Sequence, residues 1–140
     1  MPGSTDLTAL IAGMQATVRP GRFVFATTID RTLARQVDAL MRFEEAEGTT
    51  LILAPEAAAA AGLAATFPCR MITLNVVSSL EAVGFMAAVT QTLTDAGIGA
   101  NPVAGFHHDH LFIAEDQVEA ALAALRALAG QGRNDAAAFP

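Results

Sequence analysis

All three histidines of the chain lie in the stretch AGFHHDHLFI, residues 104–113. On an extended strand, His108 and His110 would share one face. Imidazole and carboxylate groups are ligands that suit zinc or iron, so a metal-dependent enzyme using His108 and His110 is one interpretation. The other is a hairpin turn at His108-Asp109, because aspartate accepts hydrogen bonds from the backbone of a turn. We favour the turn, and we predict neither a metal nor a cofactor.

A second polar cluster, SSLE, follows an apolar segment. Ser78 and Glu81 have the spacing of a helix capping box. A helix start presents free N–H groups and a partial positive charge, which suit a carboxylate, so Ser79 and Leu80 become candidate ligand contacts as well. Gly84, in the first turns of that helix, would let a ligand or a backbone approach closely. Serine catalysis is disfavoured, because no adjacent histidine and no nucleophile-elbow glycine pattern accompanies the serines.

Four further positions are candidates for ligand contacts. If residues 43–47 form a strand, Glu45 and Glu47 point to one face. They then form either a solvated edge or a partner for an amine, through charge-assisted hydrogen bonds. Asn101 could hold a ligand amide or cap a bulge, and Gly105 would line the wall of a site.

Composition removes several classes of function. The chain has 140 residues, of which 53% are hydrophobic and 16% charged, so it can bury one ordinary core or two very small ones. A net charge of −6 argues against nucleic-acid partners and anionic membrane surfaces. Residues 1–70 carry six arginines against seven acids, and residues 71–140 carry two arginines against seven acids.

Missing residue types narrow the chemistry further. Lysine is absent, which excludes lysine Schiff-base chemistry and a phosphate-loop lysine. Cys69 is the single cysteine, so the chain can form neither an intrachain disulfide nor a cysteine-rich zinc site. The first residues lack the pattern of a signal peptide, and no apolar run is long enough to span a bilayer. We therefore expect a cytoplasmic protein.

Hydrophobic periodicity and turn residues predict the elements that must position these candidates. In the first half we expect a helix from Leu7, a strand over 23–29, a hairpin around Gly48 and a short helix from Pro55 to Gly62. Residues 30–40 are ambiguous. In the second half we expect a strand over 71–77, a helix from Ser78 to Gly97, strands over 98–106 and 110–114, and a helix that Gly130 ends.

The two halves share this pattern. Residues 50–61, TLILAPEAAAAA, align without a gap on residues 110–121, HLFIAEDQVEAA, and both pass from a strand into a helix. The order indicates two copies of a β-α-β-β-α unit, the first with its long helix shortened. It predicts an α+β, ferredoxin-like fold with antiparallel sheets and helices on one face. We predict units over residues 1–66 and 67–130, and a frayed tail over 131–140.

Three stretches resemble the tandem ACT-domain proteins found in many bacteria. They are FEEAEGTTLIL (43–53), SSLEAVGF (78–85) and the run from Gly97 through Asn101 to AGFHHDHLFI. The resemblance implies two ACT-like units in tandem and a stand-alone regulatory module that is not itself an enzyme. It also implies binding of an amino acid or another small molecule, usually between units. A purely structural dimerisation module would differ only by lacking a ligand.

These observations together predict one ligand site, between the two units or between two chains. The ligand carboxylate would accept hydrogen bonds from the backbone N–H groups of Ser79, Leu80 and Glu81. Its amine would face carboxylates, for which Glu45, Glu47 and Asp109 are the candidates. Asn101 and Gly105 would line the wall, and His108 is a further candidate ligand contact. Unpaired sheet edges further predict a two-fold homodimer.

Overall fold

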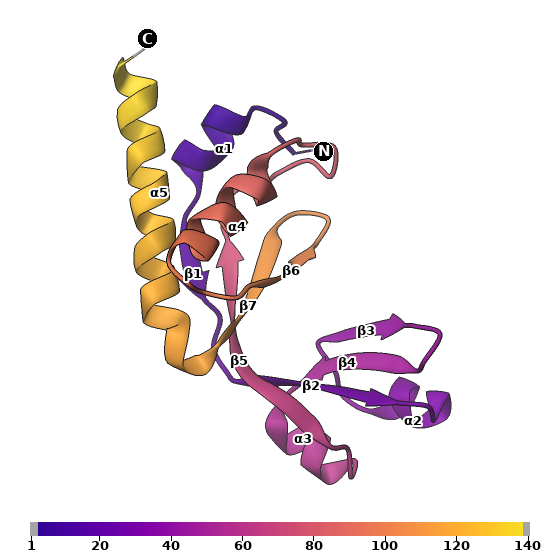
Figure 1. Cartoon of the computed structure of the whole chain (residues 1–140). Helices are drawn as coiled ribbons and strands as arrows, with labels where there is room; N and C mark the ends of the chain where they lie inside the picture. Colours follow the sequence, from indigo (N-terminus) through magenta and orange to yellow (C-terminus); the bar gives the residue numbers. More distant parts are fainter. Residues whose placement is uncertain (1–2, 139–140) are drawn as a thin grey trace. The chain divides into compact units, whose positions relative to one another are not determined.

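The computed structural model describes residues 3–138 and folds them into two compact units, whose elements are labelled in Figure 1. The central unit comprises residues 20–70. The terminal unit combines residues 3–19 with residues 71–138. Packing thus places the start of the chain with its second half. The predicted units, 1–66 and 67–130, are defined by a repeat in the sequence and not by packing in space, so that division stays a prediction.

The central unit is one uninterrupted β-α-β-β-α-β segment. Its elements are β2 (Phe23–Thr28), α2 (Arg31–Gln36), β3 (Met41–Glu44), β4 (Thr49–Leu53), α3 (Pro55–Ala60) and the first residues of β5 (Ala65–Leu74). The strands lie in the order β3-β4-β2-β5, and the pairs β3–β4, β2–β4 and β2–β5 are antiparallel. In chain order this is 2-3-1-4, the strand order of a ferredoxin-like unit.

The terminal unit repeats this order with one substitution. Its elements are α1 (Leu7–Gly13), β1 (Ala16–Val18), the last four residues of β5, α4 (Phe85–Asp95), β6 (Asn101–Ala104), β7 (Asp109–Ala114), η1 (Glu115–Gln117) and α5 (Val118–Ala138). The strands lie in the order β1-β5-β7-β6, so β1, from the start of the chain, takes the place of the fourth strand. The predicted α+β, ferredoxin-like class is confirmed.

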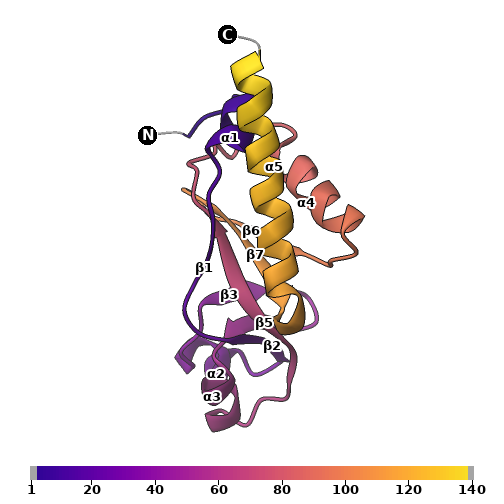
Figure 2. The same ribbon diagram turned by 90° about the vertical axis from the view of Figure 1, so that its left-hand side faces the viewer.

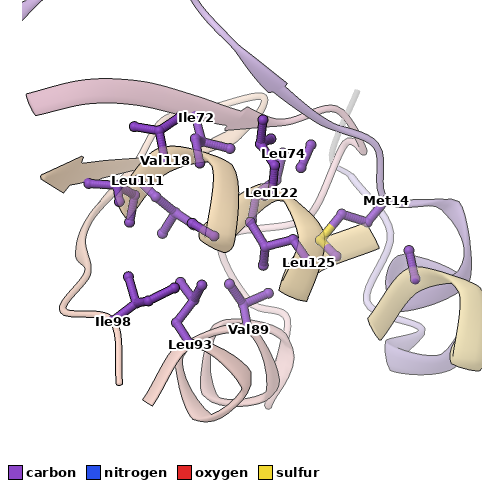
Figure 3. Close-up of a cluster of buried hydrophobic side chains, with 14 of the residues drawn as sticks. Met14, Ile72, Leu74, Val89, Leu93, Ile98, Leu111, Val118, Leu122 and Leu125 are labelled. Carbon is purple, nitrogen blue, oxygen red and sulfur yellow. The ribbon is translucent and has the colours of Figure 1, made fainter. Parts of the chain in front are cut away.

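The core of the terminal unit lies between its strands and its helices. Ile72 and Leu74 of β5 and Leu111 of β7 point toward Val89 and Leu93 of α4, as Figure 3 shows. Leucines of α5, the long helix of Figures 1 and 2, fill the same cluster. The periodicity predicted for these helices matches the buried positions, because apolar side chains at helical spacing cover one face. The central unit has its own smaller cluster, in Val24, Ala26, Ala34, Leu51, Leu53 and Ala58.

Several helix starts follow directly from the sequence. The Asp6 carboxylate caps α1 by accepting a hydrogen bond of 3.2 Å from the Ala9 N–H. The Asp30 carboxylate caps α2 in the same way, at 3.0 Å from the Leu33 N–H, and so resolves the ambiguous segment 30–40. Pro55 occupies the first turn of α3, where its missing N–H costs nothing.

Two predicted helix boundaries are wrong, the start of α4 and the end of α5. α4 begins at Phe85 and not at Ser78, because Gly84 takes a left-handed conformation with φ of +92° at the helix start. α5 continues through Gly130 to Ala138, so the predicted helix end at Gly130 is wrong. Fraying of the tail over 131–140 stays a prediction, and residues 139–140 lie outside the described part. Contact with α1 holds this extension: a Cβ atom on Gly132 would lie 2.7 Å from Ile11 Cγ2. No helix within residues 3–138 is both long and apolar enough to cross a membrane.

Replacing the fully buried Leu125 of α5 with alanine should lower the free energy of unfolding by about 2–5 kcal/mol, because contacts are lost and a cavity remains. Chemical unfolding followed by circular dichroism measures the change. Leu80, which is 66% exposed, offers the same substitution as a control, and its loss should change stability by only about 0.5 kcal/mol. Similar losses in the two variants would contradict this packing.

Candidate functional site

A small cavity of about 150 Å³ lies in the terminal unit, beside the loop that joins β5 to α4. Its lining combines two serines and one carboxylate with apolar side chains. The lining residues are Ser78, Ser79, Leu80, Ala82, Phe85, Met86, Ala104 and Asp109. Four of the predicted site residues, Ser78, Ser79, Leu80 and Asp109, therefore meet around one cavity, although 31 positions separate Ser78 from Asp109.

A hydrogen bond fixes the polar side of the cavity. The Ser78 hydroxyl, in a residue only 7% exposed, donates to Asp109 Oδ2 at 2.9 Å. Asp109 is the first residue of β7 and lies opposite Ala104 of β6 in the antiparallel register. Each carboxylate oxygen has two lone pairs, so this one donor leaves Asp109 with acceptor capacity toward the cavity.

The loop backbone is engaged differently from the prediction. The Ser79 N–H donates to the Ser4 carbonyl at 2.9 Å, and the Ser4 N–H donates to the Val77 carbonyl at 3.0 Å. The Glu81 N–H donates to the Ser79 hydroxyl oxygen at 3.0 Å. Two of the three N–H groups predicted to hold a carboxylate thus have partners inside the protein. The expected cradle fails because no helix starts at Ser78.

The hairpin between β6 and β7 turns over residues 105–108, with Phe106 and His107 at its centre, two positions earlier than the predicted His108-Asp109. The Gly105 N–H donates to the His108 carbonyl at 2.9 Å, and Asp109 already belongs to β7. Gly105 has no side chain because none would fit: a Cβ atom there would lie 2.8 Å from the His108 carbonyl oxygen and 3.3 Å from His110 Nε2. The glycine therefore supports the turn rather than lining the cavity.

His110 lies on β7 beside β5, next to the turn. Its Nδ1 atom and the Thr73 hydroxyl share a hydrogen bond of 3.0 Å. Burial is the main cause that lowers the pKa of the His110 imidazole below 6.5, and nearby His108 and Arg19 lower it further, while Asp109 acts in the opposite direction. The structure therefore favours the neutral ring at neutral pH.

The metal interpretation lacks a complete ligand set. Within residues 3–138, no three His, Cys, Asp or Glu side chains gather closely enough to hold a metal ion. The His108 ring packs edge-to-face on His107, at 6.4 Å between centroids, while His110 faces Thr73. His108 and His110 lie near each other, but among the described residues no third ligand side chain joins them.

The remaining predicted residues do not line this cavity. Glu81 lies exposed in the loop, Gly84 is the N-cap residue of α4, and Asn101 is exposed at the start of β6. Glu45 and Glu47 belong to the central unit.

The expected strand face for Glu45 and Glu47 is also wrong, because β3 ends at Glu44. The Glu45 N–H donates to the Gly48 carbonyl at 2.9 Å, which closes a turn. The Glu45 carboxylate accepts from the Thr50 hydroxyl. Beside it, Glu44 forms an ion pair of 2.8 Å with Arg31. Glu44 and Glu45 therefore have partners within the central unit.

Sequence reasoning missed the apolar half of the cavity. Phe85, Met86 and Ala82 line it from α4 and the preceding loop, and Ala104 lines it from β6. These residues carry no polar signal, and their spacing is that of an ordinary helix face. The loop's contact with Ser4 was also missed, because a parallel bridge between Ser4 and Ser78 joins positions far apart in the chain.

The fold and the cavity define a pair of ferredoxin-like modules in tandem. The chain belongs to the ACT-domain family, since family models described as the ACT domain match residues 2–70 and residues 66–127. ACT domains are regulatory modules that bind small molecules, and the resemblance seen in the sequence is thereby confirmed. No curated protein matches the chain significantly.

Solved structures show the same architecture. A Vibrio cholerae protein of unknown function, described as a possible transport protein, is 36% identical with a TM-score of 0.80, over 89% of this chain and 97% of that one. An Agrobacterium tumefaciens protein is 14% identical with a TM-score of 0.69, over 83% of this chain and 89% of that one. The ligand-free regulatory subunit of aspartate kinase from Thermus thermophilus is 12% identical with a TM-score of 0.63, over 81% and 95%. The last two likenesses concern the fold alone.

The Gly105→Ala variant should lose about 1–3 kcal/mol of unfolding free energy, because the added methyl group collides with the His108 carbonyl and the His110 ring. Gly99 is the matched control, since a Cβ atom there meets nothing within 4 Å. Gly99→Ala should leave stability unchanged or raise it by up to about 1 kcal/mol. Thermal and urea unfolding compare the two. Equal stability of both variants would contradict the close approach at Gly105.

Stability should fall as the pH drops below about 6.5, partly through His110. Its pKa is lowered in the folded state, so the unfolded chain takes up the proton first and acid favours unfolding. His110→Gln should make the unfolding free energy less dependent on pH between about 7.5 and 5.5. Urea titrations across this range measure the slope, with His107→Gln as the control for loss of a histidine. A slope unchanged in His110→Gln, or reduced equally in both variants, would rule the effect out.

Proposed function

We propose that this chain is an amino-acid-binding regulatory module without catalytic activity of its own, and that the cavity at Ser78 and Asp109 is its ligand site. The observation that carries the proposal is the Ser78–Asp109 hydrogen bond at the wall of a cavity of about 150 Å³. It places a carboxylate, a second serine and an apolar wall around a space of ligand size. Membership of the ACT-domain family supports the regulatory role.

Each end of an amino acid has a chemical partner in this cavity. The Asp109 carboxylate, held by Ser78, would accept hydrogen bonds from the ligand ammonium group. The Ser79 hydroxyl accepts from the Glu81 N–H, so its own proton remains to be donated to the ligand carboxylate. This arrangement replaces the predicted cradle of three backbone N–H groups, and it retains Ser78, Ser79, Leu80 and Asp109.

The size of the cavity favours the smallest amino acids. A cavity of about 150 Å³ holds a molecule of about six non-hydrogen atoms, the size of benzene or alanine. Phe85 and Met86 would contact a short side chain, whereas a long or aromatic one needs the loop to move. We therefore propose glycine, alanine and serine as the first ligands to test.

Regulation would act through the loop before α4. Ser4, Ser78 and Ser79 are joined by backbone hydrogen bonds, so a ligand that fixes this loop also fixes the start of the chain. Exposed Leu80 and Val83, 66% and 84% accessible, lie on the same loop and offer apolar contact to a second copy in a homodimer. A ligand that favours one loop conformation would then favour one arrangement of partners.

Thermal-shift and calorimetric titration with the amino acids test the proposal. A ligand at a hundred times its Kd should add about 2.7 kcal/mol of stability. Asp109→Asn removes the charge that meets the ammonium group, so it should weaken binding by about tenfold or more. Ala104→Leu should fill the cavity from the facing strand while leaving the carboxylate of Asp109 in place.

Asp95→Asn is the control, since Asp95 is an exposed aspartate at the end of α4. It should bind as the native chain does. The site is wrong if no amino acid stabilises the protein, or if Asp109→Asn and Ala104→Leu bind as well as the control. A dimeric mass without any ligand response would favour the purely structural module.

A further inference from the structure

A larger groove of about 500 Å³ lies on the terminal unit between β1 and α5. Figure 2 shows the two elements side by side. The floor is apolar and the rim carries polar and cationic groups. The lining residues are Met14, Gln15, Ala16, Thr17, Arg126, Ala129 and Arg133. Its volume is within the range of about 300–1,000 Å³ that ligand pockets have.

The charge of this groove opposes that of the chain. The net charge is −6, and residues 71–140 contain two arginines against seven acids. Both of these arginines, Arg126 and Arg133, line the groove, and its described lining includes no aspartate or glutamate. Positive charge in the second half of an acidic chain is thus gathered at one place.

Helix geometry sets the distance between the two guanidinium groups. Arg126 and Arg133 are seven residues apart on α5, which places them on the same face with about 10.5 Å of helix rise between them. Arg133 is anchored, because its Nη1 donates to the Ala12 carbonyl at 3.3 Å. Arg126 is exposed on the rim of the groove.

The strand side of the groove adds neutral donors. The Asn75 N–H donates to the Gln15 carbonyl, and the Arg19 N–H donates to the Met71 carbonyl, so these residues direct their backbone toward β5. Backbone N–H and C=O groups of successive residues point to opposite sides of a strand, so those of Ala16 point away from β5, toward the open edge of β1. The Thr17 side chain points to the opposite face of the strand, where its hydroxyl accepts from Asn75 Nδ2 at 2.7 Å, so Thr17 borders the groove through its backbone.

We propose that this groove binds an elongated organic dianion, with one acid group at Arg126 and the other at Arg133. Carboxylates and phosphate esters share the required chemistry, because the guanidinium fork pairs with the oxygens of either group. Buried Met14, Ala16 and Ala129 would contact the apolar chain between the two acids. The site lies on β1 and α5 and uses none of the residues around Asp109, so it extends beyond the proposed function.

Isothermal titration calorimetry at low ionic strength tests this with succinate, adipate, suberate and fructose 1,6-bisphosphate. The dicarboxylates form a ladder of increasing length, and affinity should rise along it because the longer members reach both arginines. Arg126→Gln should weaken suberate binding by about tenfold or more and should abolish the dependence on length. Binding of the bisphosphate but of no dicarboxylate would assign the site to phosphate esters.

Arg35→Gln is the matched control, an exposed arginine near the end of α2 in the central unit. It should bind as the native chain does, and so should Asp109→Asn, which separates this site from the amino-acid site. The proposal is overturned if every probe binds more weakly than about 1 mM. It is also overturned if affinity is equal along the ladder, or if Arg35→Gln weakens binding as much as Arg126→Gln.

Discussion

The pairing of β1 with the end of β5 is the interaction on which the terminal unit depends. Ala16, Thr17 and Val18 pair antiparallel with Leu74, Thr73 and Ile72, and this pairing supplies the fourth strand of a ferredoxin-like sheet. The same segment carries α1, which packs against α5 and keeps that helix regular to Ala138. It also carries Ser4, which holds the loop at Ser79.

The cavity depends on this arrangement indirectly, because Ser4 holds the loop that contains Ser78. Ser78 could cap a helix, but the chain does not turn into a helix there, and its hydroxyl is free to reach Asp109 on a different strand. Gly84, six residues later, is the N-cap residue of α4 and has a backbone conformation that a side chain would strain. The segment between them is irregular, and irregular segments on a rigid scaffold are where ligand contacts commonly lie.

The sequence predicts local features of this protein well and long-range ones poorly. The Asp6 cap, the Pro55 helix start and the shared repeat order follow from spacing alone, because each depends on neighbours along the chain. The strand expected over 71–77 begins earlier in the structure, at Ala65, because Pro68 interrupts the strand pattern of the sequence. Phe67, the residue before it, is left-handed with φ of +58°. The sequence pattern predicts one helix that starts at Ser78 and another that ends at Gly130, and neither boundary is found in the structure. The Ser78 hydroxyl instead bonds to Asp109, and α5 continues past Gly130 in contact with Ile11.

The terminal unit is built from two separate segments of the chain, and this affects the order in which the chain folds. The central unit is contiguous, so its contacts close short loops and can form as soon as residue 70 has left the ribosome. β1 must wait for the end of β5, whose paired residues lie 54 to 58 positions later in the chain. α1 must wait for α5, across more than a hundred residues of sequence. Long-range closure is slow. We therefore expect the central unit to fold first and the first part of the chain to acquire its native contacts last.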